Sequence, residues 1–439
     1  MKRLLALGWV LLLAACQTDT SPMEENDPSE ETGSDLPNIM LIIADDMGLD
    51  ATPGYAIGTQ KPSMPNLETL SANGIRFNNL WSYSTCTPTR SSILTGKNGI
   101  NTQVLGVGDE LSITEESLQS YISRLSGNAY DQAVIGKWHL SSDLTHPTSM
   151  GVPYYSGLLS GSVQSYWDWN WADNGMSNSE TTYTTTKFAD LAIDWLDDTS
   201  KPWFLWLAFN APHTPFHLPD TDLHQQGSLP TDQASIDANP LPYYLAMLEA
   251  LDTELGRVIN SLSQEERDNT IFIFIGDNGS PGQVVQEYNS RRSKGSIYQG
   301  GINVPLIISG KGVSRMNETE DALLQTTDLF ATISQLAGIN TSSIHDSQSF
   351  QPLLTGSGPS TREYAFAESR DDNAGGIDYA IRNETHKYIL FSDGTEALYY
   401  MVGNFIENPN LLSANQAPLS AENEAVLIEL QGQLDQIIN

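Results

Sequence analysis

The chain has 439 residues, and its 54 acidic residues against 21 basic ones give a formal net charge of −33. Such a charge argues against nucleic acid or an anionic membrane surface as a binding partner, because both are polyanions. The length exceeds one minimal domain and suits a large α/β domain with a smaller domain appended. Because the chain as a whole is so negative, an anionic substrate would need positive charge gathered locally at its site.

The first 16 residues have the pattern of an export signal. Lys2 and Arg3 precede a short apolar run, residues 4–13, and the segment ends in Leu-Ala-Ala-Cys at Cys16. The run is too short to cross a bilayer as a mature helix, and its ending resembles the bacterial lipoprotein signal, in which the cysteine is acylated. We expect an exported lipoprotein of the outer membrane, on its periplasmic face or at the cell surface. An ordinary cleaved signal that happens to end in cysteine is the alternative.

Residues 17–36 are polar, contain acidic but no basic residues, and are predicted to form a disordered tether. The large domain is expected at residues 37–355 and a C-terminal subdomain at residues 362–439. Apart from Cys16, the chain has a single cysteine, Cys86, which has no partner for an intramolecular disulfide. Cys86 is therefore either a buried passenger or a residue with a chemical role.

Four apolar runs without alternation predict strands that are buried on both faces, at residues 38–44, 133–135, 203–209 and 271–275. Helical spacing of apolar residues occurs at 244–258 and 327–336. Strands that alternate with helices predict a doubly wound, mostly parallel sheet flanked by helices. Beyond residue 360, short runs at 364–367, 379–381, 388–391 and 398–401, followed by a helical pattern at 427–438, predict a small α+β subdomain with a meander.

Polar residues follow each of the four predicted strands directly. They are Asp45 and Asp46, Lys137 to His139, Asn210 to His213, and Asp277 and Asn278. Open α/β sheets bind ligands beyond the carboxyl ends of their strands, so these four endings predict one convergent site.

Asp45, Asp46, Asp277 and Asn278 all offer oxygen atoms, which suits Ca²⁺ or Mg²⁺ better than zinc. The alternative interpretation is that each pair caps the N-terminus of a following helix, as Asp and Asn often do after a strand. Two such pairs at the predicted edge of one sheet favour the metal.

Cys86 lies in the segment Ser84-Thr85-Cys86-Thr87-Pro88-Thr89-Arg90. Pro88 favours the first turn of a helix, so Cys86 is expected at a helix N-terminus, where free N–H groups attract anions. Arg90, one turn later, can fold back towards it. A thiol in this position could be a nucleophile of low pKa.

Cys86-x-Pro88-x-Arg90 followed by Ser-Ser-Ile-Leu-Thr-Gly at residues 91–96 resembles the signature of the formylglycine-dependent sulfatases, arylsulfatase-like members of the alkaline phosphatase superfamily. Further blocks at residues 38–46, 136–140, 211–215, 276–279 and 294–302 match that family in the same order, and the resemblance covers residues 37–412. The chain departs from the family pattern at Thr89, Gln299 and Asn303. The last of these removes a positive charge near the expected site.

The resemblance implies an alkaline-phosphatase-like fold and hydrolysis of sulfate esters. It implies that a separate maturation enzyme oxidises Cys86 to formylglycine, whose hydrated aldehyde attacks sulfur. It also implies roles for the matched residues. One Ca²⁺ would be held by Asp45, Asp46, Asp277, Asn278 and the residue made from Cys86, and Arg90 would hold the formylglycine. The charge on the transferring sulfate group would be offset by Lys137, Lys294 and His213, and His213 or Lys294 would protonate the leaving group. His139 would take a proton from the second hydroxyl of the hydrated aldehyde.

A sulfated carbohydrate is the expected substrate. Residues 166–171 carry four aromatic rings that could share one face of a strand and stack on sugar rings, although packing against the core is the alternative. His217 is a candidate for substrate contact, whereas His146, His224, His345 and His386 are expected to be ordinary surface residues. Two other functions stay open: a formylglycine phosphodiesterase or phosphonate monoester hydrolase, and a non-catalytic, glycan-binding lipoprotein.

Overall fold

The computed structural model describes residues 36–356, 362–370 and 375–439. The predicted signal, Cys16 and nearly all of the predicted tether lie outside these residues. The described part from Leu36 to Asn439 is one compact unit. None of its helices is both long enough and apolar enough to span a membrane.

The large sheet has eleven strands in the order β10-β2-β9-β8-β1-β7-β3-β4-β5-β6, with β11 beside β2. Its strands are β1 (Asn38–Ala44), β2 (Gly74–Trp81), β3 (Asp131–Gly136), β4 (Tyr155–Gly157), β5 (Trp169–Asp173), β6 (Met176–Glu180), β7 (Trp203–Ala208), β8 (Thr270–Gly276), β9 (Asn303–Gly310), β10 (Glu318–Glu320) and β11 (Leu324–Gln325). The adjacent strands β8, β1, β7 and β3 are parallel, and they are the four predicted strands. The predicted mostly parallel α/β sheet is therefore confirmed.

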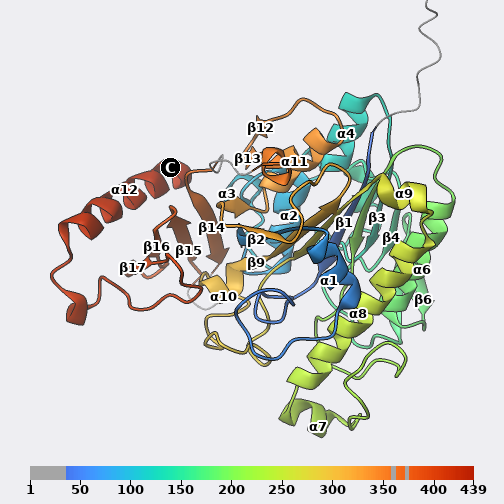
Figure 1. Cartoon of the computed structure of the whole chain (residues 1–439), viewed down its shortest axis with the longest axis horizontal. Helices are drawn as coiled ribbons and strands as arrows, with labels where there is room; N and C mark the ends of the chain where they lie inside the picture. The colour runs from blue at the N-terminus through green and yellow to red at the C-terminus, as the bar shows by residue number, and fades with distance from the viewer. Residues whose placement is uncertain (1–35, 357–361, 371–374) are drawn as a thin grey trace, which may run out of the picture. The chain divides into compact units, whose positions relative to one another are not determined.

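The apolar runs are buried because helices cover both faces of the sheet (Figure 1). On β1, Met40 and Ile42 belong to one core cluster, while Ile39, Leu41 and Ile43 belong to the other. The helices are α1 (Pro65–Ala72), α2 (Cys86–Thr95), α3 (Gly99–Thr102), α4 (Leu118–Ser126), α5 (His146–Ser149), α6 (Thr184–Asp197), α7 (Gln233–Ala238), α8 (Leu241–Ser261), α9 (Gln264–Asp268), α10 (Gln299–Ile302), α11 (Asp328–Leu336) and α12 (Ala421–Ile438). Helices α1, α6 and α8 pack in the first cluster, and α2, α4 and α11 in the second.

The C-terminal region forms the predicted meander. Its antiparallel strands are β14 (Ala365–Arg370), β15 (Ile377–Arg382), β16 (His386–Leu390) and β17 (Glu396–Tyr400). Helix α12 covers this sheet through Leu430 and Leu434, which are buried. In the chain order between β11 and β14, a two-stranded ribbon is made by β12 (Ser343–Ile344) and β13 (Ser347–Gln348).

The sequence did not predict β2, β9 or the pairing of β4 to β6. Strand β9 runs antiparallel to β8 and to β2 and so departs from the doubly wound pattern. The alternation in β2 is interrupted by a register shift between Phe77 and Leu80, which hides its period of two. Short strands such as β4 form because a long neighbour offers a free edge, which no local pattern reveals.

Strand β14 places a buried carboxyl group, that of Glu368, next to helix α3. Its Oε1 accepts a hydrogen bond from the N–H of Ile100 at 3.1 Å, and its Oε2 has no hydrogen-bond partner. Burial raises the pKa of Glu368 to about 8. Between pH 4.5 and about 8, the folded chain therefore keeps a proton that the unfolded chain has lost.

This difference predicts a loss of stability as pH rises through that window, because the folded state binds more protons than the unfolded state. We expect Glu368→Gln to raise the free energy of unfolding by roughly 2–4 kcal/mol at pH 8.5 and to change it little at pH 4.5. Denaturant unfolding at the two pH values measures this. An equal effect at both would show that the carboxyl group does not titrate in this range.

Candidate active site

The four strand endings meet at one edge of the large sheet, as predicted. Backbone hydrogen bonds join them directly: the N–H of Asp45 donates to Ala211 O at 3.1 Å, and that of Asp277 to Ala44 O at 3.1 Å. The N–H of Lys137 donates to Ala208 O at 2.8 Å. The side chains that follow the strands are therefore held by the backbone of the sheet.

The helix-capping interpretation of the acidic pairs is wrong. Asp45 and Asp46 lead into turns, and the next helix begins at Pro65; after Asp277 and Asn278 the next helix begins at Gln299. Asp46 has φ 72°, a left-handed conformation that is unusual for a residue with a side chain and is typical of functional sites.

Two oxygen atoms of the four predicted metal ligands are buried without a hydrogen-bond partner, Asp45 Oδ1 and Asn278 Oδ1. Buried polar atoms are almost always paired, so two orphaned acceptors in one cluster suit a cation that the hydrogen-bond network does not supply. The donor set of three carboxylates and one amide oxygen is the type that calcium prefers. The residues present therefore fit the metal that the sequence predicts.

Three cations pair with the three carboxylates. Lys137 Nζ lies 2.6 Å from Asp45 Oδ2, and both side chains have no exposed surface. Arg90 Nη2 lies 2.8 Å from Asp277 Oδ2, also fully buried.

Lys294 Nζ lies 2.6 Å from the carboxylate of Asp46. Burial opposes ionisation of Asp46, but Lys294, His213 and Lys137 together lower its pKa below the usual range. Because fixed charges balance here, a divalent ion would make the site positive enough to receive an anion, despite the charge of the whole chain.

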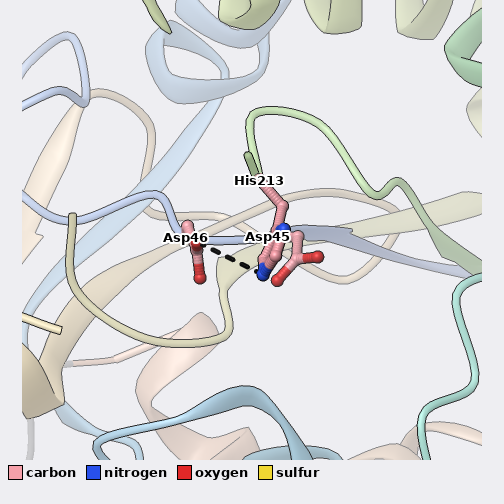
Figure 2. A group of neighbouring side chains, drawn as sticks. All are labelled: Asp45, Asp46 and His213. Carbon is pink, nitrogen blue, oxygen red and sulfur yellow. Dashed lines mark ion pairs between the residues drawn. The ribbon is translucent and has the colours of Figure 1, made fainter. Parts of the chain in front are cut away.

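His213 reaches the same cluster from the loop that follows β7. Figure 2 shows its ring beside the two carboxylates, with Nε2 3.8 Å from Asp46 Oδ2. Asp45, Asp46 and His213 form one group with the spacing of metal ligands, and Asp45, Cys86 and Asp277 form a second. The two groups share Asp45, so the predicted site residues lie in one continuous cluster.

Cys86 is the first residue of α2, as Pro88 predicted. It is buried, and its Sγ lies 3.1 Å from Nδ1 of His139. Burial raises the pKa of the Cys86 thiol, with Lys137 opposing this. The shift is opposite in direction to the low-pKa thiol nucleophile that the position at a helix N-terminus suggested.

His139 is held in an unusual conformation beside Cys86. It has φ 57°, and a Cβ added to Gly161 would lie 2.2 Å from its Nε2, so the loop over the ring requires glycine there. Burial, Lys137 and Arg90 lower the pKa of His139 to about 2. The ring is therefore neutral near pH 7.

Arg90 and Lys294 are positioned by contacts that the motifs alone do not show. Arg90 Nη1 donates to Lys137 O at 2.7 Å, which ties α2 to the segment after β3. The N–H of Lys294 donates to Ser280 O at 3.1 Å, and the next N–H, of Gly295, donates to Ser84 O at 2.8 Å. The last lysine is thus fixed to the segments before Cys86 and after Asn278.

Close packing of the backbone explains why glycines occupy the family-matching positions 279 and 300. A Cβ on Gly279 would lie 1.8 Å from the carbonyl oxygen of Gly300. The turn after Asn278 and the Gly-Gly turn therefore pack backbone against backbone. Asn303, which stands where the family pattern often has a positive charge, donates to Asn78 O at 3.0 Å.

Three residues that position the catalytic side chains were not recognised from the sequence. Tyr244 on α8 donates to Asp46 O at 2.8 Å, and the Ser280 hydroxyl accepts from the N–H of Gly48 at 3.2 Å. The hydroxyl of Tyr166 lies 2.6 Å from His213 O and 2.8 Å from Asn210 O and so holds the loop that carries His213. Tyr244 fits an amphipathic helix pattern like any core residue, and its role at Asp46 is therefore invisible in the pattern.

The aromatic residues at 166–171 do not form a platform for sugar rings. Strand β5 begins only at Trp169, and Tyr166 and Trp169 are buried in the core. Trp167 and Trp171 pack against the same cluster. The packing alternative is the correct one for this stretch.

The histidines outside the site also differ from expectation. His217 has its Nε2 3.0 Å from the Tyr183 hydroxyl and its Nδ1 2.9 Å from Pro215 O, so both nitrogens are engaged within the chain and substrate contact is not supported. Of the expected surface histidines, His146, His224 and His386 are buried. Trp138 of the Gly-Lys-Trp-His block donates to His146 at 3.1 Å, which explains the tryptophan structurally.

Comparisons with known proteins agree with this geometry. The Sulfatase family matches residues 37–339. The chain is 25% identical over 409 aligned residues to an arylsulfatase of Klebsiella aerogenes, covering 69% of this chain and 87% of that protein, and 26% identical over 377 to arylsulfatase G of Rattus norvegicus, covering 72% and 68%.

Two solved structures share the fold. Ps i-CgsB in complex with k-i-k-neocarrahexaose has a TM-score of 0.78 at 21% identity, covering 92% of this chain and 93% of that one. BT4656, solved with its substrate D-glucosamine-2-N,6-O-disulfate, has a TM-score of 0.73 at 21% identity, covering 92% and 97%. The chain belongs to the sulfatase family, whose members hydrolyse sulfate esters.

Proposed function

We propose that this sulfatase removes sulfate from a sulfated carbohydrate, with a formylglycine made from Cys86 and one calcium ion. The observation that carries the proposal is the position of Cys86, buried at a helix N-terminus between His139 and a cluster with two orphaned oxygens. The carbohydrates named for Ps i-CgsB and BT4656 support the substrate class.

Asp45, Asp46, Asp277 and Asn278 would hold the ion, together with residue 86, whose Sγ stands in for the formylglycine oxygens. When present, the ion would neutralise charge on the sulfate group and the hydrated aldehyde would supply the nucleophile. Arg90 fixes Asp277 and the segment of Lys137, and Lys137 adds positive charge beside the reacting group.

Proton transfer is assigned to the histidines and to Lys294. His139 is neutral and 3.1 Å from the position of the nucleophile, so it accepts the proton that residue 86 must lose. His213 and Lys294 keep exposed fractions of 15% and 21%, whereas Arg90 and Lys137 are fully buried. They therefore face the side from which substrate enters, and either can protonate the leaving alcohol.

Removal of the metal tests this assignment. We expect sulfate release by the matured enzyme to fall at least about a hundredfold in excess chelator and to return with Ca²⁺, because the carboxylates would otherwise face the anion. Ion chromatography of released sulfate measures the loss and the recovery of activity, and the same enzyme is assayed in parallel on phosphodiesters. Unchanged rates in chelator would contradict the metal site, and faster phosphodiester cleavage would favour the formylglycine phosphodiesterase.

We also propose export as a lipoprotein acylated at Cys16, attached to the outer membrane. The support is the sequence pattern alone, since Cys16 lies outside the described residues. The mass of the N-terminal peptide from the native host tests it, and an unacylated N-terminus would refute it.

A further inference from the structure

A cavity of about 410 Å³ opens beside His139. Its volume is within the range of roughly 300–1,000 Å³ that is typical of small-molecule sites. We call it the His139 pocket. Its polar lining comes from Glu110, Ser141, Ser142, Ser160, Asn170 and Ser177, and Asp109 lies at the same wall.

The pocket adjoins the catalytic cluster at one shared residue, His139. The ring of His139 lines the pocket and also lies 3.1 Å from Cys86 Sγ. A sugar ring that reaches past His139 from the reacting centre would enter this space.

Strand β5 explains the polar character of the wall. Side chains alternate along a strand, and Trp169 and Trp171 pack with the core on one face. The alternate positions, Asn170 and Ala172, line the pocket. The pocket therefore offers an amide and hydroxyls where the sequence had suggested stacked rings.

The charges of the pocket differ from those of the catalytic cluster. Among its lining residues in the described chain there is no lysine or arginine. Asp109 is paired with Arg370, which has no place in the lining. Glu110 is exposed and accepts a hydrogen bond from the Ser141 hydroxyl, without a cationic partner among its contacts in the described chain.

Resting on the proposed function, we propose that the His139 pocket holds an uncharged, hydroxyl-rich sugar ring next to the cleaved sulfate, and that Glu110 selects against rings with a second anionic group. Serine hydroxyls, an amide and a carboxylate match sugar hydroxyls, which both donate and accept. A second sulfate or a carboxylate on that ring would meet Glu110 with no cation to offset it. Arg90, Lys137 and Lys294 lie in the catalytic cluster and do not line the pocket.

The test compares kcat/KM for matched substrates with matured full-length enzyme. Each monosulfated neutral sugar of a panel is paired with the same sugar carrying a second sulfate or a C6 carboxylate. We expect the wild type to prefer the singly charged member at least about tenfold, as for like charges near a protein surface, and to lose part of this preference at high salt.

Glu110→Gln is expected to reduce the preference several-fold, mainly through faster turnover of the doubly charged sugars. Glu116→Gln is the matched control, because it removes the same charge from a partly exposed residue that pairs with Arg124 outside the pocket. Its preference should equal that of the wild type.

The possible failures are distinguishable. Turnover chiefly of doubly charged sugars, or a preference that Glu110→Gln does not change, would overturn the inference and leave the sulfatase function intact. No turnover of any sugar on the panel, by enzyme whose formylglycine is verified by mass, would overturn the proposed carbohydrate sulfatase function itself.

Discussion

Replacing Cys86 with alanine is expected to lower kcat/KM for sulfate esters by at least about 10⁴-fold, because loss of a nucleophile removes the step on which the other catalytic groups act. The side chain is buried and makes its one side-chain hydrogen-bond contact among the described residues with His139, so the fold should be retained. A change in the free energy of unfolding of about 1 kcal/mol is expected for so small a deletion.

Sulfate release and thermal unfolding of the same preparations measure the two effects. Cys86→Ser is the informative companion, because it keeps a hydroxyl nucleophile but offers no thiol for oxidation to the aldehyde. We expect it to fail in turnover as Cys86→Ala does. Full activity of Cys86→Ala, or of Cys86→Ser whose residue 86 is still serine by peptide mass, would refute the formylglycine mechanism. Loss of folding in both variants would leave the peptide mass of the wild type as the deciding measurement.

Replacing Lys137 with methionine is expected to have the largest effect on stability. The substitution keeps the length of the side chain but leaves the carboxylate of Asp45, which is fully buried, without its partner at 2.6 Å. Removing one member of a buried pair typically costs about 3–5 kcal/mol, because the other charge stays desolvated. Activity should fall at least about a thousandfold, since the positive charge beside the sulfate is lost.

The metal provides the sharper readout for this variant. A divalent ion at Asp45 would offset the unpaired carboxylate, so the destabilisation should be greatest in chelator and should diminish when Ca²⁺ is added. Lys201→Met is the matched control: Lys201 is half exposed and 3.8 Å from Asp131, so its removal should change stability by less than about 1 kcal/mol. Equal destabilisation of Lys137→Met with and without calcium would argue against an ion at this position.

The local sequence was sufficient to predict the strands that carry the site and the residues at their ends. Runs such as residues 38–44 and 271–275 are apolar at every position after the first, because a central parallel strand is covered on both faces. The polar residues that follow them do not suit an apolar core, and this contrast makes Asp45 and Asp277 recognisable from the sequence alone. Pro88 likewise made it possible to predict the start of α2 and the position of Cys86 in its first turn.

What the sequence could not determine is which partner each of these groups finds. The pairing of Lys137 with Asp45, Arg90 with Asp277 and Lys294 with Asp46 joins segments far apart in the chain, and any cation could have faced any carboxylate. The tertiary structure also decided the roles of aromatic residues. Tyr244 supports Asp46, and Tyr166 holds the loop of His213, because packing places their hydroxyl groups there.

The substrate pocket is the clearest example of this division. The pattern at residues 166–171 shows aromatic alternation but not which face of β5 meets the core, and the opposite face lines the pocket. The sequence by itself determined the reaction centre, because that chemistry needs particular side chains at the ends of buried strands. Only the tertiary structure decided the pocket beside it, because its lining is assembled from loops and an edge strand whose neighbours are set by the fold.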